Sequence, residues 1–413
     1  MTIHLPHTLI TPTRLWTQEE ASVAIETKVG ALRAQGVVAG QVVMFNAEAV
    51  AETVWTLHAL TRLGAVAMPV AAQSTPERSL DLGQIQARSA APGTAIRLLT
   101  SGTTGKPKVV DLSLKQLEAS ALASTTRLGH LESDRWLCCL PLHHIGGLSI
   151  LLRTALNRAT AELHPRFDPD AVNQSIAEGT TMVSLVPTML ARVLDARNDT
   201  PFPESLRAIL LGGAPAPPPL IERCRRINAP VALTWGMTET ASQVATRAPG
   251  DLRDAPDCGL PLEGLSVTVE DGLLVVHGPV APQGRFQTSD RGRIDEQGRV
   301  VVLGRTDDLV ISGGENVAPL FVERILNTHP SVMEVAVVGR PDPQWGQRLV
   351  AFLVGSTDLD LPAWARERLA PHERPAEVHW VAELPRNAMG KVDRSALTNE
   401  AELRHGFPET RGD

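Results

Sequence analysis

The chain has 413 residues, a formal net charge of −7 and a hydrophobic share of 43%. A chain of this length can build a large core and is expected to divide into two or more domains. Charges of both signs are scattered along it, and it has no tyrosine and only 7 Trp and 7 Phe, which argues against a nucleic-acid-binding surface.

The N-terminus has no basic stretch followed by an apolar one, and no apolar run in the sequence reaches membrane-spanning length. The four cysteines show no CxxC spacing, which is typical of reduced thiols; they are Cys138, Cys139, Cys224 and Cys258. We therefore expect a cytoplasmic protein without membrane insertion.

The first part of the chain alternates helix and strand patterns. Thr17 and Glu20 form a capping box ahead of a helix that runs to about residue 35. The other elements expected here are a strand at 41–45, a helix at 47–63, a strand at 65–70, and a polar surface connection at 71–94 that is broken by Pro and Gly.

The alternation resumes with a strand at 95–99. Ser113 and Gln116 can cap a helix to about residue 127, and Asp168-Pro169 is a typical helix start. The next expected elements are strands at 182–186, 207–211 and 231–235, and helices at 187–196 and 219–227. Strands that alternate with helices predict a mostly parallel sheet covered on both faces.

The pattern changes near residue 258. Short strands at 266–269, 273–276, 292–294 and 300–303 predict a small β-rich subdomain. A separate α+β unit of about a hundred residues is expected after it. Its predicted elements are a helix from Pro319, strands at 335–338 and 349–354, and a helix at 362–369.

A loop rich in glycine, hydroxyl and lysine side chains follows the strand at 95–99. It reads Thr100-Ser101-Gly102-Thr103-Thr104-Gly105-Lys106-Pro107-Lys108-Val109. Glycines let successive N–H groups point to one place, and hydroxyls and lysines add donors and positive charge, so the loop predicts a phosphate site. A P-loop would have Ser or Thr after Gly-Lys, where this chain has Pro107. A plain hairpin turn would explain the glycines but not the lysines and hydroxyls together.

A second segment, Trp235-Gly236-Met237-Thr238-Glu239-Thr240, also follows a strand. The carboxylate of Glu239 beside hydroxyls suits Mg²⁺, which takes one or two protein carboxylates together with phosphate oxygens. Trp235 could stack on a purine ring. A helix-capping glutamate and a core tryptophan are the structural alternative.

Two segments near the C-terminus complete the set. Residues 304–316 place Arg305 and aspartates close to Gly313-Gly314, which suits a hinge or a ribose-phosphate contact, and equally a charged linker. Residues 385–393 place Lys391 in a glycine-containing loop, where a lysine is ordinarily a surface residue.

The four segments together resemble those of the adenylate-forming superfamily, which includes acyl- and aryl-CoA ligases, peptide-synthetase adenylation domains and luciferases. The resemblance covers roughly residues 40–400. A finer resemblance to the o-succinylbenzoate–CoA ligase family of menaquinone biosynthesis rests on residues 141–148, 184–190, 210–217 and 238–243. The chain departs from the family pattern at His143, Trp235 and Thr288-Ser289-Asp290, and its region before the phosphate loop is short.

The resemblance implies an α/β multi-domain fold with helix-flanked sheets. It implies an N-terminal domain over 1–304 (with the β-rich subdomain at about 258–304), a hinge at 305–307 with Asp307, and a small mobile C-terminal domain over 308–413. It further implies a ligase that uses ATP and Mg²⁺ to form an acyl-adenylate and then transfers the acyl group to coenzyme A.

The resemblance also implies the roles of individual residues. The catalytic residues would be Lys391, Thr238 and Glu239, with Glu239 also the Mg²⁺ ligand. ATP and AMP would be bound by Thr100, Ser101, Gly102, Thr103, Thr104, Gly105, Lys106, Lys108, Gly212, Gly213, Ala214, Trp235, Gly236, Asp290 and Arg305. CoA would pass Gly313 and Gly314, and the acid would meet His144, Arg153, Ser242 and Gln243.

Arg153 lies in an apolar stretch, Leu148 to Leu156, where an unpaired arginine would be costly. Its side chain could extend to water or pair with an acidic neighbour. The functional interpretation, which we favour, is that Arg153 receives the second carboxylate of a diacid.

Other functions remain as alternatives. One is a ligase for another aryl or acyl acid, such as a benzoate-like or medium-chain acid. A peptide-synthetase adenylation domain fits less well, because no carrier domain is present, and a catalytically silent binding protein would be expected to lose Lys391 or the loop. The expected partners are the acid, ATP and CoA, without nucleic acid, and the sequence leaves a homo-oligomer open.

Overall fold

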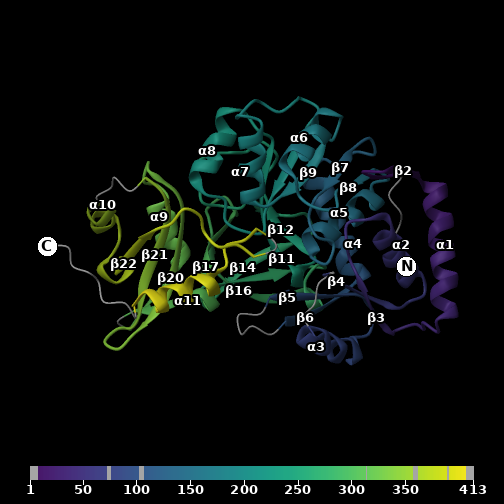
Figure 1. Ribbon diagram of the computed structural model, residues 1–413, viewed down its shortest axis with the longest axis horizontal. Coiled ribbons are helices and arrows are strands. Elements are labelled where there is room, and N and C mark those ends of the chain that lie inside the picture. Colours follow the sequence, from purple (N-terminus) through teal and green to yellow (C-terminus); the bar gives the residue numbers. More distant parts are fainter. Residues whose placement is uncertain are drawn as a thin grey trace.

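The computed structural model divides into a large N-terminal part and a smaller C-terminal part at opposite ends of its long axis (Figure 1). The described strands form four sheets. The structure describes residues 8–71, 76–101, 107–312, 314–356, 361–387 and 390–405.

A nine-stranded sheet forms the centre of the N-terminal part, in the order β13-β12-β11-β10-β9-β7-β8-β1-β2. The strands from β11 to β1 in this order are parallel, and β2, β12 and β13 are antiparallel to their neighbours. The predicted mostly parallel sheet is therefore confirmed for its interior. The strands are β1 (Thr8–Thr11), β2 (Arg14–Thr17), β7 (Arg135–Cys138), β8 (Thr160–Leu163), β9 (Met182–Leu185), β10 (Ala208–Leu211), β11 (Val231–Met237), β12 (Ser242–Thr246) and β13 (Leu260–Pro261).

A second, four-stranded sheet carries the phosphate loop. Its order is β3-β4-β5-β6, and β5 and β6 form an antiparallel hairpin in which Ser101 pairs with Pro107. The described residues on either side of the loop's centre therefore lie at the end of this hairpin. The strands are β3 (Val42–Asn46), β4 (Val66–Val70), β5 (Thr94–Ser101) and β6 (Pro107–Ser113).

The helices of the N-terminal part begin where the sequence places their caps. Thr17 with Glu20, and Ser113 with Gln116, form reciprocal capping boxes, and the Asp168 carboxylate accepts two backbone N–H bonds. These three predicted starts are confirmed. The helices are α1 (Gln18–Ala34), α2 (Ala51–Arg62), α3 (Pro76–Ala87), α4 (Leu114–Leu128), α5 (Ile145–Leu156), α6 (Pro169–Ala177), α7 (Pro187–Ala196) and α8 (Pro218–Arg226), with a short 3-10 turn η1 (Thr238–Thr240).

Two predictions in this part are wrong. The supposed surface connection at 71–94 contains α3, because Leu82 and Ile85 lie one turn apart and bury their side chains against β3 and β4. The helix predicted at 47–63 begins only at Ala51, since residue Ala47 is still extended and donates its N–H to the carbonyl of Val70.

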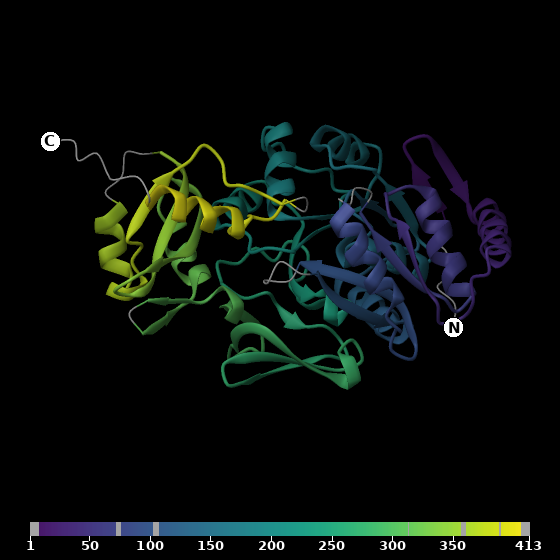
Figure 2. The same ribbon diagram turned by 60° about the horizontal axis from the view of Figure 1, so that its bottom comes forward.

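The third sheet is antiparallel in the order β14-β15-β16-β17 and confirms the predicted β-rich segment. It stands apart from the other sheets in Figure 2, where it is the green sheet at the bottom. Its elements are β14 (Ser266–Glu270), β15 (Leu273–His277), η2 (Pro282–Gly284), β16 (Arg285–Ile294) and β17 (Val300–Arg305).

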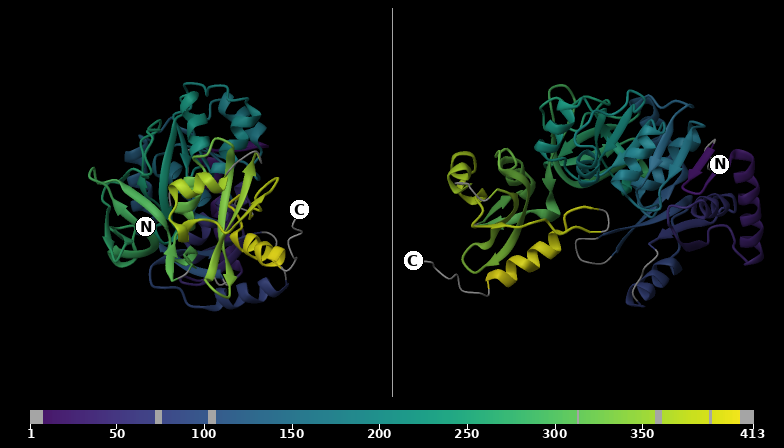
Figure 3. Two further views of the ribbon diagram at one scale, coloured as in Figure 1. Left: turned by 90° about the vertical axis from the view of Figure 1, so that its left-hand side faces the viewer. Right: turned by 45° about the horizontal axis from the view of Figure 1, so that its top comes forward.

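The C-terminal part follows a single 3-10 turn, η3 (Thr306–Asp308). Its sheet has the order β19-β18-β21-β20, with β22 beside β21. The segment between β22 and α11 extends away from this sheet toward the N-terminal part (Figure 3). The elements are β18 (Val310–Ser312), β19 (Glu315–Val317), α9 (Pro319–Leu326), β20 (Val332–Asp342), β21 (Gly346–Gly355), α10 (Leu361–Arg368), η4 (Pro371–Glu373), β22 (Glu377–Trp380) and α11 (Arg394–His405).

The buried hydrophobic side chains form several clusters. The largest joins the central sheet to the β3–β6 sheet, a second lies on the central sheet with α6, α7 and α8, a third joins β14–β17 to β11 and β12, and separate clusters fill the C-terminal part. The described helices include none that is both long and apolar enough to cross a bilayer. The predicted domain boundaries at 304, 307 and 308 stay predictions.

Candidate active site

The β5–β6 hairpin, which carries the predicted phosphate site, contacts the segment that follows β11. The Lys108 ammonium lies 2.8 Å from the Glu239 carboxylate, although 131 residues separate them in sequence. Thr100 donates its hydroxyl to the Lys108 carbonyl at 3.5 Å, which closes the base of the hairpin. The loop residues Gly102, Thr103, Thr104, Gly105 and Lys106 lie outside the described residues.

The end of β11 is shaped by a close backbone approach. A Cβ on Gly236 would lie 1.8 Å from the Ser242 carbonyl oxygen, so only glycine allows β12 to come so near. Ala241 and Ser242 between the strands have φ of 54° and 112°, a conformation that non-glycine residues rarely adopt. Ser120 holds this turn by donating its hydroxyl to the Ala241 carbonyl at 2.8 Å. Thr238 and Glu239 lie in η1 at the same place.

Trp235 connects β11 to the third sheet. Its indole N–H donates to Asp290 at 2.7 Å, and its ring is buried in the core of that sheet. Asp290 is 8% exposed, and burial raises the pKa of its carboxyl group against the opposing effect of the Trp235 hydrogen bond. The predicted stacking of Trp235 on a purine stays a prediction, and the core alternative accounts for its observed contacts.

Asp290 and Arg305 face each other across β16 and β17. They are direct register partners, and their nearest charged atoms are 3.8 Å apart. Arg305 also pairs with Asp307 of η3 at 2.8 Å. The two predicted ribose contacts and the predicted hinge residue are thus adjacent.

Lys391 reaches this place from the C-terminal part. Its Cε lies 3.5 Å from the position that a Cβ on Gly213 would occupy, directly after β10. Burial and then the charge of Arg305 lower the pKa of Lys391. Gly212 packs just as tightly, since a Cβ there would lie 2.6 Å from the Thr234 methyl. Lys391 therefore lies over Gly213, in the segment that follows β10.

Arg153 is buried on α5 and is 1% exposed. It donates from Nη2 to the Ser242 hydroxyl at 3.0 Å, its guanidinium lies 5.3 Å from the Trp136 ring centroid, and its Nε has no hydrogen-bond partner among the described residues. Within the described part of the chain it forms no ion pair with a carboxylate. Burial lowers the pKa of Arg153 to about 9, so the group stays a cation at neutral pH.

The other predicted acid-binding residues lie at the start of α5 and on β12. His144 is the N-cap residue of the same helix, and its ring lies 4.2 Å from that of His143 between centroids. Gln243 is buried on β12 and donates to Thr246 at 2.9 Å, while its Oε1 has no partner within the described ranges. Arg153 and Ser242 thus meet between α5 and β12, and Gln243 follows Ser242 on that strand.

The predicted CoA loop lies in the C-terminal sheet. Gly314 precedes β19, and a Cβ on it would meet nothing within 4 Å. Gly313 falls outside the described residues.

Two residues that contact these groups have no role in the sequence prediction. Trp136 lies beside the Arg153 guanidinium, and Thr188 donates its hydroxyl to Gly390 next to Lys391. The signal for Thr188 is its place directly after a strand, where ligands of parallel sheets lie.

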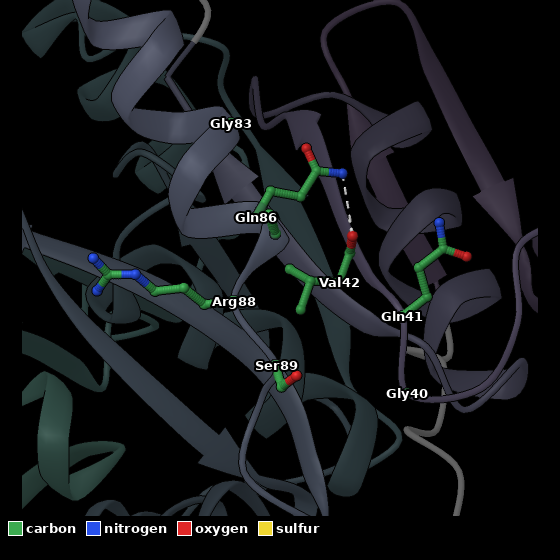
Figure 4. A pocket seen from close by; sticks show the side chains of 8 residues that line it. Gly40, Gln41, Val42, Gly83, Gln86, Arg88 and Ser89 are labelled. Carbon is green, nitrogen blue, oxygen red and sulfur yellow. Dashed lines mark hydrogen bonds between the residues drawn. The ribbon is translucent and has the colours of Figure 1, made fainter.

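A separate hollow of about 450 Å³ lies between β3 and α3 (Figure 4). The Gln86 side chain donates to the Val42 carbonyl across it at 3.2 Å. None of the predicted site residues lines it.

Comparisons with known proteins agree with this geometry. Residues 83–281 match the model of the AMP-binding enzymes, and residues 322–391 match the AMP-binding enzyme C-terminal domain. A 2-succinylbenzoate–CoA ligase of Bacillus cytotoxicus is 39% identical over 73% of this chain and 69% of its own length. The corresponding ligase of Bacillus licheniformis is 39% identical over 78% and 75%.

Solved structures give the same result. The o-succinylbenzoate CoA synthetase of Bacillus subtilis in complex with the acyl-adenylate intermediate matches with a TM-score of 0.83 at 34% identity, over 95% of both chains. The same synthetase with ATP and magnesium ion matches with a TM-score of 0.83 over 95% and 96%. ATP-bound MatB from Rhodopseudomonas palustris matches with a TM-score of 0.86 at 25% identity, over 97% and 96%. The chain belongs to the family of AMP-binding enzymes and is an AMP-forming acid–CoA ligase.

Proposed function

We propose that the acid is 2-succinylbenzoate, so that the protein is the 2-succinylbenzoate–CoA ligase of menaquinone biosynthesis. The observation that carries this proposal is Arg153, a buried cation that donates to the Ser242 hydroxyl and whose Nε has no partner in the described part of the chain. A charge that is buried without a counterion lowers the free energy of unfolding by roughly several kcal/mol. A diacid supplies that counterion with the carboxylate that is not activated, and the similar ligases are named for such a diacid.

The first step joins the acid to ATP. A carboxylate oxygen attacks the α-phosphorus, a new O–P bond forms, and pyrophosphate leaves with the electron pair of the broken bond. Because two anions meet, cations held in place lower the barrier. Lys391 is the cation we assign to the acid and the α-phosphate, and Lys108 with the loop at 100–106 is assigned to the leaving pyrophosphate.

The nucleoside is assigned to the remaining cluster. Asp290 and Arg305 suit the ribose hydroxyls, and the Gly212–Ala214 turn, Trp235 and Gly236 suit the adenine side. Thr238 and Glu239 lie between these groups and the phosphate hairpin.

Mg²⁺ fits this donor set. The described residues contain no group of three His, Cys, Asp or Glu side chains that would hold a metal alone. Glu239 offers one carboxylate beside Lys108, and Mg²⁺ in nucleotide sites takes one or two carboxylates and completes its shell with phosphate oxygens and water. When bound, the ion neutralises triphosphate charge.

The second step transfers the acyl group from AMP to the CoA sulfur. The thiolate attacks the acyl carbon, a C–S bond forms, and AMP leaves with the C–O electron pair. We assign the rotation between the steps to the hinge at Asp307, which brings the Gly313–Gly314 turn in as Lys391 withdraws. The cytoplasmic location and a homo-oligomer stay predictions.

The test is AMP release with 2-succinylbenzoate against a panel of benzoates and fatty acids, each with and without CoA. We expect the highest kcat/KM for 2-succinylbenzoate, with steady turnover only when CoA is present. Higher kcat/KM for a monoacid would overturn the substrate and favour the other aryl- or acyl-CoA ligases. No AMP release with any acid of the panel would favour the alternative of a catalytically silent binding protein with the same fold.

A further inference from the structure

A hydrogen bond connects the two parts of the protein beside Lys391. The Thr188 hydroxyl donates to the carbonyl oxygen of Gly390 at 3.1 Å, across 202 positions of sequence. Thr188 lies in the first turn of α7, immediately after β9, whereas Gly390 lies between β22 and α11. The bond therefore joins the central sheet to the segment that carries Lys391.

The turn that presents Lys391 is held together from the C-terminal side. Asn387 and Lys391 are joined by a backbone bond of 2.9 Å, and Gly390 donates its N–H to the Asn387 carbonyl at 2.9 Å. Arg386 donates to the Gly390 carbonyl at 3.1 Å and pairs with Glu334 of β20 at 2.6 Å. The C-terminal sheet thus determines the shape of the turn, and Thr188 determines where it rests on the other domain.

Gly390 and Thr188 are packed closely against each other. Gly390 has φ of 72°, and a Cβ on it would lie 2.9 Å from the Thr188 hydroxyl oxygen. One residue later, Lys391 lies over Gly213. Two consecutive residues therefore contact the segments that follow two neighbouring strands, β9 and β10, and a shift of the first moves the second.

We propose that Thr188 is a positioning residue for acid activation, acting through the Gly390 carbonyl on Lys391. It touches neither the acid nor ATP in this role. When Lys391 withdraws for transfer to CoA, the Thr188–Gly390 bond breaks, so Thr188 stabilises the first arrangement only. This inference rests on the proposed two-step reaction but not on which acid is used.

The test compares the two half-reactions in Thr188→Val, which keeps the shape of the side chain and removes the hydroxyl. Acid-dependent exchange of pyrophosphate into ATP reports activation, and thioester formation from prepared acyl-adenylate and CoA reports transfer. We expect exchange kcat to fall about 3- to 10-fold, the size of one ordinary hydrogen bond. Transfer should keep its wild-type rate.

Two companion variants separate position from packing. Thr188→Ser retains the donor and should recover most of the exchange rate. Thr27→Val removes a hydroxyl that donates to the Val23 carbonyl at 2.9 Å within the exposed helix α1, and should change neither half-reaction. Thermal unfolding of each variant shows whether the fold is intact.

Equal slowing of both half-reactions, unchanged exchange in Thr188→Val, or failure of Thr188→Ser to recover would each overturn the proposal. The acid for these assays is whichever member of the panel the wild type activates best. A wrong substrate assignment therefore appears in the wild-type panel, and a wrong role for Thr188 appears in the ratio between variants.

Discussion

Arg153 and Ser242 meet at 3.0 Å, guanidinium to hydroxyl, although 89 residues lie between them. Ser242 reaches Arg153 from a backbone with φ of 112°, and the close passage of β11 and β12 at Gly236 holds that backbone in place. Strained non-glycine residues concentrate at functional sites, where the surrounding structure holds them. This pairing brings the predicted acid site together from α5 and β12.

Arg153→Met should weaken binding of the diacid specifically. Methionine fills the space without the charge, so the second carboxylate loses a charge-assisted hydrogen bond, worth about 1.5–3 kcal/mol or roughly 10- to 100-fold in KM. KM for benzoate should change little, because benzoate has no second carboxylate. Steady-state KM for both acids checks this. An equal rise for both would mean that Arg153 is structural.

The same substitution should raise the stability of the empty protein. A buried charge without a carboxylate is costly, and an apolar side chain of similar length relieves that cost. Thermal unfolding without ligand should give a higher Tm for Arg153→Met than for the wild type.

Arg97 provides the matched control. It is 2% exposed but pairs with Asp111 at 2.7 Å and donates to three backbone carbonyls. Arg97→Met leaves those acceptors unpaired and should lower Tm. If both substitutions lower Tm alike, Arg153 already has a counterion in the empty protein.

Lys391→Ala should abolish pyrophosphate exchange and largely spare thioester formation from prepared acyl-adenylate. The lysine cation is needed where the carboxylate meets the α-phosphate, and the second step has no such encounter of anions. Lys115→Ala, an exposed position on α4, serves as the control and should leave both reactions unchanged. Equal loss in both half-reactions would contradict the role given to Lys391.

The fall in the pyrophosphate exchange rate at high pH, the alkaline limb of its pH profile, should report the loss of the Lys391 charge. Burial and the Arg305 charge lower its pKa below the usual 10.5, so its charge, and with it the exchange rate, is lost as the pH rises through this lowered pKa. Arg305→Gln removes the charge contribution and should move the limb to higher pH. The measurement is kcat for exchange against pH with saturating substrates, which separates this shift from weaker nucleotide binding. A limb that stays in place or moves to lower pH would contradict the assignment.

The sequence predicted elements best where the local signal is complete. Thr17 with Glu20, Ser113 with Gln116, and Asp168-Pro169 each specify a helix start within four residues of chain, and each forms as expected. It predicted α3 poorly, because polar residues and Gly83 hide the two side chains, Leu82 and Ile85, that bury against the neighbouring sheet. Such a helix is stabilised by tertiary packing rather than by its own propensity.

For the candidate site, too, local sequence determined some features and tertiary structure determined the others. The sequence alone determined which residue types are available: a glycine- and lysine-rich loop after a strand, a carboxylate after another strand, a lysine near the C-terminus, and an arginine in an apolar stretch. Chemistry of this kind can be recognised in short segments because each group needs only its neighbours in the chain. Only the tertiary structure decided that Lys391 lies over Gly213, that Arg153 meets Ser242 instead of water, and that Thr188 holds the Gly390 carbonyl. Those contacts join residues tens to hundreds of positions apart, and the packing of the sheets and domains, rather than any local pattern, brings them together.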